Sequence, residues 1–101
     1  EPVHALGLLE IRRGRRDRAL PLLRKAAALA PAAPRYAYVY ALALQEGGEL
    51  PQALAVIEQA LGQSPQEASL LQLRIALEKR LGRNDDARRH EAEYRRLAIG
   101  S

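Results

Sequence analysis

The chain has 101 residues, a formal net charge of +4 and no cysteine. This length suffices for one domain with a modest core. The missing thiols exclude disulfides, thiolate zinc ligands, cysteine nucleophiles and covalent c-type haem attachment in this chain. Apolar residues make up 48% of it, mostly Ala and Leu, with no Phe, Trp or Met. Because Ala and Leu are strong helix formers and β-branched residues are few, the composition predicts an all-α fold.

The charge is distributed in three bands. Residues 1–33 carry a net +4, residues 34–67 a net −3 and residues 68–101 a net +3. A nucleic-acid module more often shows one continuous basic face, so nucleic-acid binding is the least favoured class of function. No apolar run approaches the ~20 residues of a membrane span. The opening "EPVHALGLLE" lacks the features of a signal peptide. It is typical of an internal segment, so we expect a piece of a longer cytoplasmic or periplasmic protein.

The chain repeats itself with a constant period of about 34 residues. Five kinds of position recur at this spacing, and they are Gly14, Gly48 and Gly82; Ala19, Ala53 and Ala87; Ala26 and Ala60; Leu20 and Leu54; Pro31 and Pro65. Each block predicts a helix, a turn at the glycine, a second helix with a small residue where the two pack closely, and a proline after the end. We therefore expect repeats at 1–33, 34–67 and 68–101, stacked around a continuous core.

In the first block, the basic stretch "IRRGRRDRAL" from Ile11 to Leu20 surrounds the predicted turn. Arg12 and Arg13 would end the first helix, where positive charge complements the helix dipole. Asp17 would cap the second helix, and Pro21 would fall in its first turn. The stretch is therefore interpreted mainly as architecture. An anion-binding role is the alternative.

In the third block, the last helix is interpreted as a C-terminal cap of the stack. Its apolar stripe is narrow, as expected of a terminal repeat: Ala87, Tyr94, Leu97 and Ala98. Asn84 and Asp85 suit its N-cap, and Arg95 and Arg96 suit the negative end of its dipole.

Candidate chemistry is sparse. Asp86 and His90 are four residues apart, a spacing that can pair or bind a metal, and a solvated surface pair is the favoured interpretation. No third metal ligand is nearby in the sequence. No catalytic residue, metal or cofactor is predicted.

These residues resemble the tetratricopeptide repeat (TPR) over the whole chain. Leu6 and Gly7 stand at the Leu-Gly pair of the family's first helix, and Gly14, Ala19, Leu23, Ala26 and Pro31 fill its later positions. The second block matches with Tyr40 and Ala41 in place of Leu-Gly, whereas the third is degenerate, with Arg74 and Ile75 there, Glu91 for the large apolar residue and Tyr94 for the second Ala. The resemblance implies a right-handed superhelical solenoid of three antiparallel helix pairs.

The resemblance also implies a concave groove, lined by the first helix of each pair, where partners bind. The implied groove residues are His4, Leu8, Ile11 and Arg12; Arg35, Tyr38, Val39, Leu42 and Gln45; Gln72, Leu73, Ala76, Lys79 and Arg80. Their centre is apolar and their rim is basic. This composition suits an amphipathic helix or an apolar extended segment with an acidic flank.

We therefore expect a protein-binding scaffold and not an enzyme. The alternative is a homo-oligomerisation or intramolecular assembly module of a larger protein, with the groove filled by a second copy or by the parent chain. Some members of the family clamp the C-terminal carboxylate of heat-shock chaperones with Lys and Asn. We do not expect this clamp, because the first two blocks have no Lys in their first helices and Asn84 is the only Asn.

One phrase carries a narrower resemblance. "RYAYVYALAL", from Arg35 to Leu44, is similar to wording in TPR tails of bacterial multihaem c-type cytochrome-like proteins. That likeness implies an exported domain that serves a redox partner, although the chain has no haem motif of its own.

Overall fold

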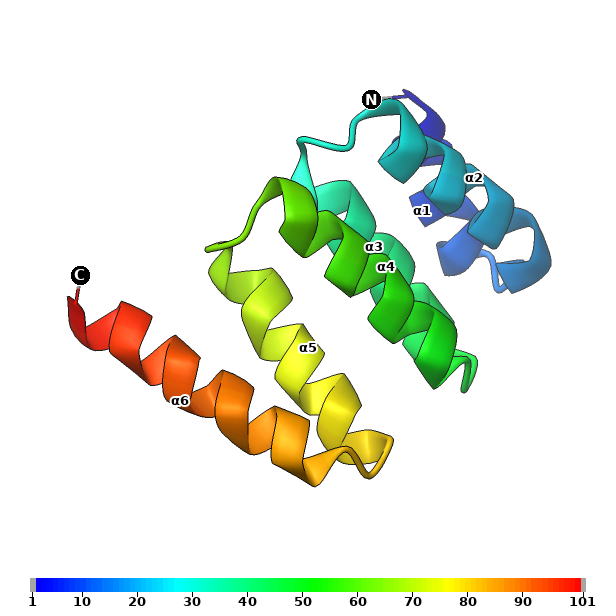
Figure 1. Ribbon diagram of the computed structural model, residues 1–101. Coiled ribbons are helices and arrows are strands. Elements are labelled where there is room, and N and C mark those ends of the chain that lie inside the picture. Colours follow the sequence, from blue (N-terminus) through cyan, green and yellow to red (C-terminus); the bar gives the residue numbers. More distant parts are fainter. Residues whose placement is uncertain (1, 101) are drawn as a thin grey trace.

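The computed structural model describes residues 2–100 and contains six helices in that range (Figure 1). They are α1 (Pro2–Arg12), α2 (Arg16–Leu29), α3 (Pro34–Glu46), α4 (Leu50–Gln63), α5 (Ala68–Arg80) and α6 (Asn84–Gly100). Successive helices pack as antiparallel hairpins, and the hairpins stack side by side into an elongated body measuring 39 × 27 × 18 Å. The predicted all-α solenoid of three helix pairs is confirmed.

The turn inside each hairpin is made by the recurring glycine. Gly14, Gly48 and Gly82 have φ values of 72°, 80° and 77°, which only glycine adopts without strain. After each glycine, the next backbone N–H bonds back to a carbonyl of the preceding helix, as Arg15 does to Glu10 at 2.8 Å. This Schellman arrangement satisfies carbonyls that the end of the helix leaves open. The three glycines therefore recur at a constant spacing because each makes the same kind of turn.

The recurring alanines mark the contact between the two helices of each pair. Ala19, Ala53 and Ala87 are all fully buried or nearly so. α1 and α2 also approach closely at Gly7, where an added Cβ would lie 2.6 Å from Cδ2 of the buried Leu23. Small residues at these places let the helices approach closely and bring larger side chains into contact around them.

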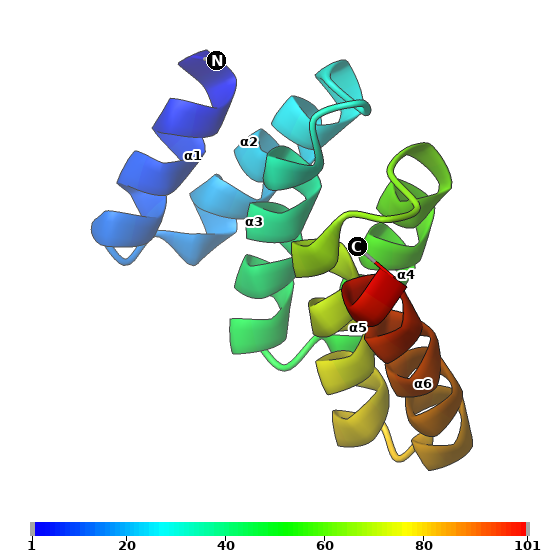
Figure 2. The ribbon, with the colours of Figure 1, turned by 90° about the vertical axis from the view of Figure 1, so that its left-hand side faces the viewer.

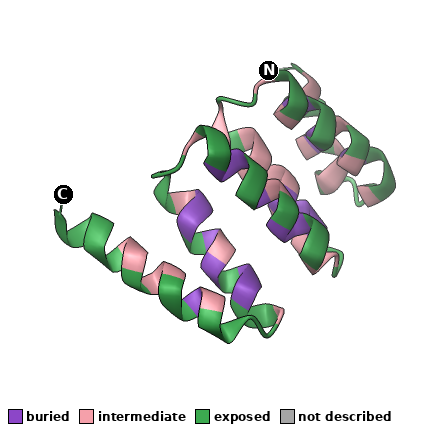
Figure 3. Ribbon diagram, viewed as in Figure 1, coloured by how far each residue is buried: buried purple, intermediate pink, exposed green. Residues whose placement is uncertain are grey.

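The core runs through the middle of the stack. Figure 3 shows the buried residues gathered along α4 and α5. The core cluster is drawn from α3, α4 and α5, and its large members include Leu44, Leu54, Ile57, Leu70 and Leu77. By contrast, Ala87 is the only buried residue within the described part of α6. The exposed residues of that helix are mostly polar as far as Arg96, as a terminal element of a stack requires, whereas Leu97 and Ile99 are exposed apolar residues near its end.

Three predictions about helix ends were wrong. α2 begins at Arg16 with Arg15 at the N-cap, so Asp17 lies inside the first turn, and Pro21 is in the helix interior. α6 begins at Asn84, and the carbonyl of Arg83 accepts the first helical bond, from Ala87 at 3.0 Å. The Schellman turn explains both shifts, because it delivers the chain into helical geometry immediately after the glycine and one further residue.

The end of the last helix also differs from expectation. α6 continues to Gly100, and its last turn contains no basic residue. Arg95 and Arg96 therefore lie about one turn before the end, where the field of the helix terminus is already weaker.

Candidate partner-binding surface

The predicted groove residues are distributed over α1, α3 and α5, the first helices of the three pairs. Five apolar members are neither fully buried nor fully exposed: Leu8, Ile11, Tyr38, Val39 and Leu42. Tyr38 and Leu42 pack their inner sides against the core cluster and keep part of their surface open. An apolar row that is half-buried in this way is rigid and still accessible, which suits a docking surface.

Two predicted groove residues lie inside the protein instead. Leu73 belongs to the core cluster. His4 is buried, and its ring lies 4.5 Å from the ring of Tyr36, centroid to centroid, so it joins α1 to α3. Helical spacing placed both residues on the inner side of their helices, where the neighbouring helices cover them. Burial leaves them little surface to offer a partner.

Gln45 is partly exposed as a residue but has a buried polar atom. Its carbonyl oxygen is buried and accepts no hydrogen bond from residues 2–100. An unsatisfied buried acceptor costs about 1–3 kcal/mol. This side chain is therefore the least satisfied polar group among the predicted groove residues that remain partly exposed.

The basic rim divides into free and engaged groups. Arg12, Arg35 and Arg80 are exposed and form no ion pair within the described residues. Lys79 instead places its Nζ 3.0 Å from Oε2 of Glu91 on α6. Gln72 is also turned toward α6, where its amide donates to the Tyr94 hydroxyl at 2.5 Å. In the third pair, two of the predicted groove side chains thus fasten α5 to α6. Ala76, between them, is exposed.

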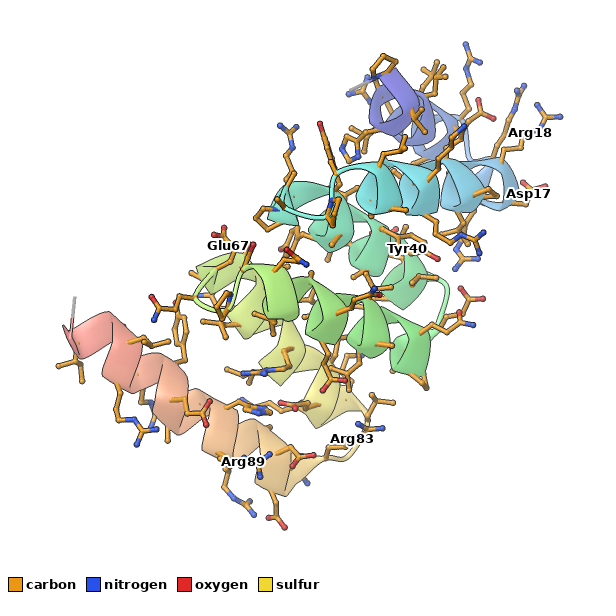
Figure 4. All side chains as sticks on the ribbon, turned by 45° about the horizontal axis from the view of Figure 1, so that its top comes forward. Asp17, Arg18, Tyr40, Glu67, Arg83 and Arg89 are labelled. Carbon is orange, nitrogen blue, oxygen red and sulfur yellow. The ribbon has the colours of Figure 1, made fainter. Side chains whose placement is uncertain are left out.

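Two clefts of the described surface lie away from this apolar row. A cleft of about 330 Å³ opens between α2 and α4, above α3, and Tyr40, Arg24, Gln59 and Gln63 are its polar lining. Figure 4 shows Tyr40 rising from α3 between these two helices. A second cleft of about 300 Å³ lies between α5 and α6 and includes Ile75 and Tyr94. Gln72 is the one predicted groove residue that lines either cleft. The other predicted groove residues line neither of these two clefts.

Several arginines of the stretch around Gly14 form ion pairs within the fold. Nη2 of Arg16 lies 2.7 Å from Oε2 of Glu49 and 3.4 Å from the carbonyl oxygen of Ala43, so it fastens α2 to the next pair. Arg13 and Arg15 lie 3.7 Å and 3.9 Å from the carboxylate of Glu10. Arg18 and its neighbour Asp17 stand at the outer edge of the turn (Figure 4). The architectural interpretation holds for these contacts.

The proposed Asp86–His90 pair is wrong. Asp86 pairs with Arg89 at 3.0 Å, and the Nδ1–H of His90 donates to Oε1 of Glu78 at 2.8 Å. Glu78 is only 2% exposed. Helix geometry allows Asp86 to reach residues three or four positions away, and Arg89 offers a full charge at that spacing. His90 faces inward, toward α5. No sequence signal identified Glu78, because a charged residue at a helical position looks exposed until the neighbouring helix is placed.

Residues 2–100 contain no group of three or more His, Asp or Glu side chains placed to hold a metal ion. None of their helices is long and apolar enough to cross a membrane.

A stack of helix hairpins with a constant period and a partly open apolar row on its first helices defines a helical-repeat scaffold. The comparison with protein families is consistent with this class. The profile described as Tetratricopeptide repeat matches residues 4–68 and, again, residues 43–101. The chain belongs to the tetratricopeptide repeat family, a family of protein-interaction scaffolds. No curated protein matches the chain significantly in sequence.

Solved structures of MamA share the fold. The structure named MamA AMB-1 is 26% identical, with a TM-score of 0.81 over 98% of this chain and 59% of its own. MamA MSR-1 is 25% identical with a TM-score of 0.81, over 96% of this chain and 56% of its own. MamA from Desulfovibrio magneticus RS-1 reaches a TM-score of 0.85 at 22% identity, over 98% of this chain and 56% of its own. The chain thus spans a little more than half the length of these MamA chains.

Proposed function

We propose that the surface of α1, α3 and α5 binds an amphipathic helix or an apolar extended segment of a partner protein. The observation that carries the proposal is the half-buried apolar row Leu8, Ile11, Tyr38, Val39 and Leu42, in a chain that belongs to a family of interaction scaffolds. Such a row offers a partner an apolar area without requiring the scaffold to rearrange. Catalysis and a resident cofactor are not part of the proposal.

The charges beside the row indicate the character of the partner. Arg12, Arg35 and Arg80 point to a segment with acidic residues on its flank, because their guanidinium groups have no carboxylate within the described chain. Lys79 is excluded from this role while it pairs with Glu91. Such charges chiefly set the association rate and the choice of partner, whereas the apolar row supplies most of the affinity.

A displayed library of random peptides tests this proposal whatever the identity of the partner. We expect the selected peptides to combine aliphatic residues at helical spacing with Asp or Glu. Leu42→Glu should weaken their binding by at least about tenfold. Arg35 is exposed, so Arg35→Glu should not affect folding. This variant should weaken binding less than Leu42→Glu and reduce the salt dependence of binding. Ile99→Glu, at a side chain 85% exposed on α6, is the matched control.

Circular dichroism would establish that each variant keeps its helicity. Peptides that bind Leu42→Glu and Arg35→Glu as tightly as the original protein would exclude this surface as the docking site. Sedimentation velocity over a wide concentration range distinguishes the rival function. A dimer that Leu42→Glu dissolves would mean that a second copy fills the surface and that the domain is an assembly module.

A further inference from the structure

The first junction between pairs keeps a cleft that the second junction fills. We call this cleft of about 330 Å³ the α2/α4 cleft, and three alanines, one from each neighbouring helix, help to line it: Ala27, Ala37 and Ala60. One repeat later, the same three positions hold Leu61, Leu71 and Tyr94. Both leucines belong to the buried core cluster, and the tyrosine packs against it. Larger side chains therefore occupy the second junction at the places where the first is hollow.

The place of the α2/α4 cleft within the stack leaves it uncovered. Its lining comes from α2, α3, α4 and the connection between α2 and α3, and from no other described helix. Figure 2 shows the second helix of each pair to the right of the first helix, so α2 and α4 border the cleft on the side of the second helices. Neither α1 nor the third pair reaches across it. A further pair stacked in the same way at either end would also leave it open, so an occupant would come from outside the repeat stack.

The polar groups of the cleft indicate the chemistry of that occupant. Arg24 is the one charged residue of the lining, and its guanidinium forms no ion pair within residues 2–100. Tyr40, Gln59 and Gln63 add a hydroxyl and two amides, and these side chains form no hydrogen bond with other described residues. At the second junction Glu58 takes the position of Arg24, so the positive charge is particular to the first.

This set of groups fits a peptide segment better than a free organic acid. Hydroxyl and amide side chains both donate and accept hydrogen bonds, which matches the N–H and C=O groups on either side of an anchoring side chain. The size agrees, because pockets for drug-sized molecules measure about 300–1,000 Å³ and this cleft of about 330 Å³ lies at their lower limit. One bulky apolar side chain would bury its surface against the alanines, and an aromatic ring buries the most.

We propose that the α2/α4 cleft binds a short segment of a partner protein, with one aromatic side chain against Ala37 and Ala60 and the carboxylate of an adjacent residue at Arg24. The aromatic anchor supplies most of the affinity, whereas Arg24 is exposed and supplies a smaller share. None of the predicted groove residues lines this cleft. The site is therefore separate from the surface of Leu8 and Leu42 proposed above, and each can fail without the other.

Three capped tetrapeptides test the anchor and the charge: Ala-Phe-Glu-Ala, Ala-Phe-Gln-Ala and Ala-Ala-Glu-Ala. Binding to the whole domain is followed by NMR of carbon-13-labelled alanine methyl groups, because Ala37 and Ala60 lie in the cleft itself. We expect the first peptide to shift both methyl resonances to saturation. The Gln peptide should bind about two- to fivefold more weakly. The peptide without Phe should cause no shift, and Arg24→Gln should abolish the difference between the two Phe peptides.

Variants that fill the cleft complete the test. Ala37→Leu introduces the side chain that the third pair has at Leu71, and Ala27→Leu copies Leu61 in the same way, so the fold should accommodate both. Each should abolish binding of the Phe peptides. Ala55→Leu, the same substitution at an exposed position of α4 outside the cleft, is the matched control. Ala55→Leu and Leu42→Glu should leave binding unchanged, and circular dichroism would verify the helicity of every variant.

Four results would overturn the proposal. They are the absence of any shift at Ala37 and Ala60, binding of Ala-Phe-Glu-Ala that survives both Ala27→Leu and Ala37→Leu, equal affinity of the Glu and Gln peptides, and loss of binding on Leu42→Glu, which would assign the peptide to the other surface. A fifth comparison separates the peptide from a small molecule. If 3-phenylpropanoate bound as tightly as Ala-Phe-Glu-Ala, the cleft would be a site for free aromatic acids and the assignment to a partner protein would be wrong.

Discussion

The second and third helix pairs have the same backbone arrangement and fill it with different chemistry. Where the second pair has Leu44 and Val56, the third has the buried Glu78 and its hydrogen-bonded partner His90. Ala41 and Ala60 of the second pair are likewise replaced by the larger Ile75 and Tyr94, which line a cleft between α5 and α6. The glycine turn and the alanine contact are shared by both hairpins, whereas the other interior positions accept either apolar side chains or a hydrogen-bonded polar pair.

The pair Glu78–His90 provides the largest expected effect. His90→Val leaves the buried carboxylate without its donor and should destabilise the domain by about 3–5 kcal/mol. The double variant Glu78→Leu/His90→Val restores the side chains of the second pair. It should be close to the original stability or above it, because an apolar pair needs no compensating hydrogen bond. Urea unfolding of both variants measures the difference.

Leu44→Glu, made in the second pair, is the matched reverse substitution. It should be strongly destabilising because Val56 offers no donor. If the double variant were as unstable as His90→Val alone, the third pair would depend on the polar contact itself, and the two pairs would not be interchangeable.

The size of the residue at the helix–helix contact gives an intermediate effect. It increases from Gly7 through Ala41 to Ile75 along the chain. Gly7→Ala places a Cβ 2.6 Å from Leu23 Cδ2 and should destabilise the domain by about 1–3 kcal/mol. Gly62→Ala, in α4 with nothing within 4 Å of the added Cβ, should instead stabilise it by up to about 1 kcal/mol. Thermal unfolding followed by circular dichroism compares the two, and a neutral Gly7→Ala would show that α1 can move away from α2 without cost.

The junctions between pairs provide the smallest effect. Arg16 binds Glu49 between the first and second pairs, whereas Leu50 and Arg83 stand in these places between the second and third. Because both side chains are well exposed to solvent, a double-mutant cycle with Arg16→Met and Glu49→Gln should give a coupling energy below about 1 kcal/mol. The coupling should decrease in high salt. A value of several kcal/mol would indicate that this ion pair, and not apolar burial, holds the first junction together.

The sequence by itself determined the architecture. A constant repeat period, a glycine at each turn and an alanine at each helix contact are local requirements, and each recurs in the structure at Gly14, Gly48 and Gly82 and at Ala19, Ala53 and Ala87. Helical spacing also indicated which residues of α1, α3 and α5 share a side. It could not separate the half-buried Leu42 from the buried Leu73, because both point inward and only the neighbouring helices decide how far each is covered.

Only the tertiary structure decided the partners of the charged and exposed residues. His90 bonds to Glu78 and not to the predicted Asp86, and Arg16 bonds to Glu49 of the next pair. These partners lie 12 and 33 residues away along the chain, so local spacing could not indicate them. Likewise, Leu6 looks like a core residue in the repeat pattern, and it is exposed because no helix among residues 2–100 lies beyond α1. Periodicity reports the side of a helix on which a residue lies. What covers that side is a property of the stack.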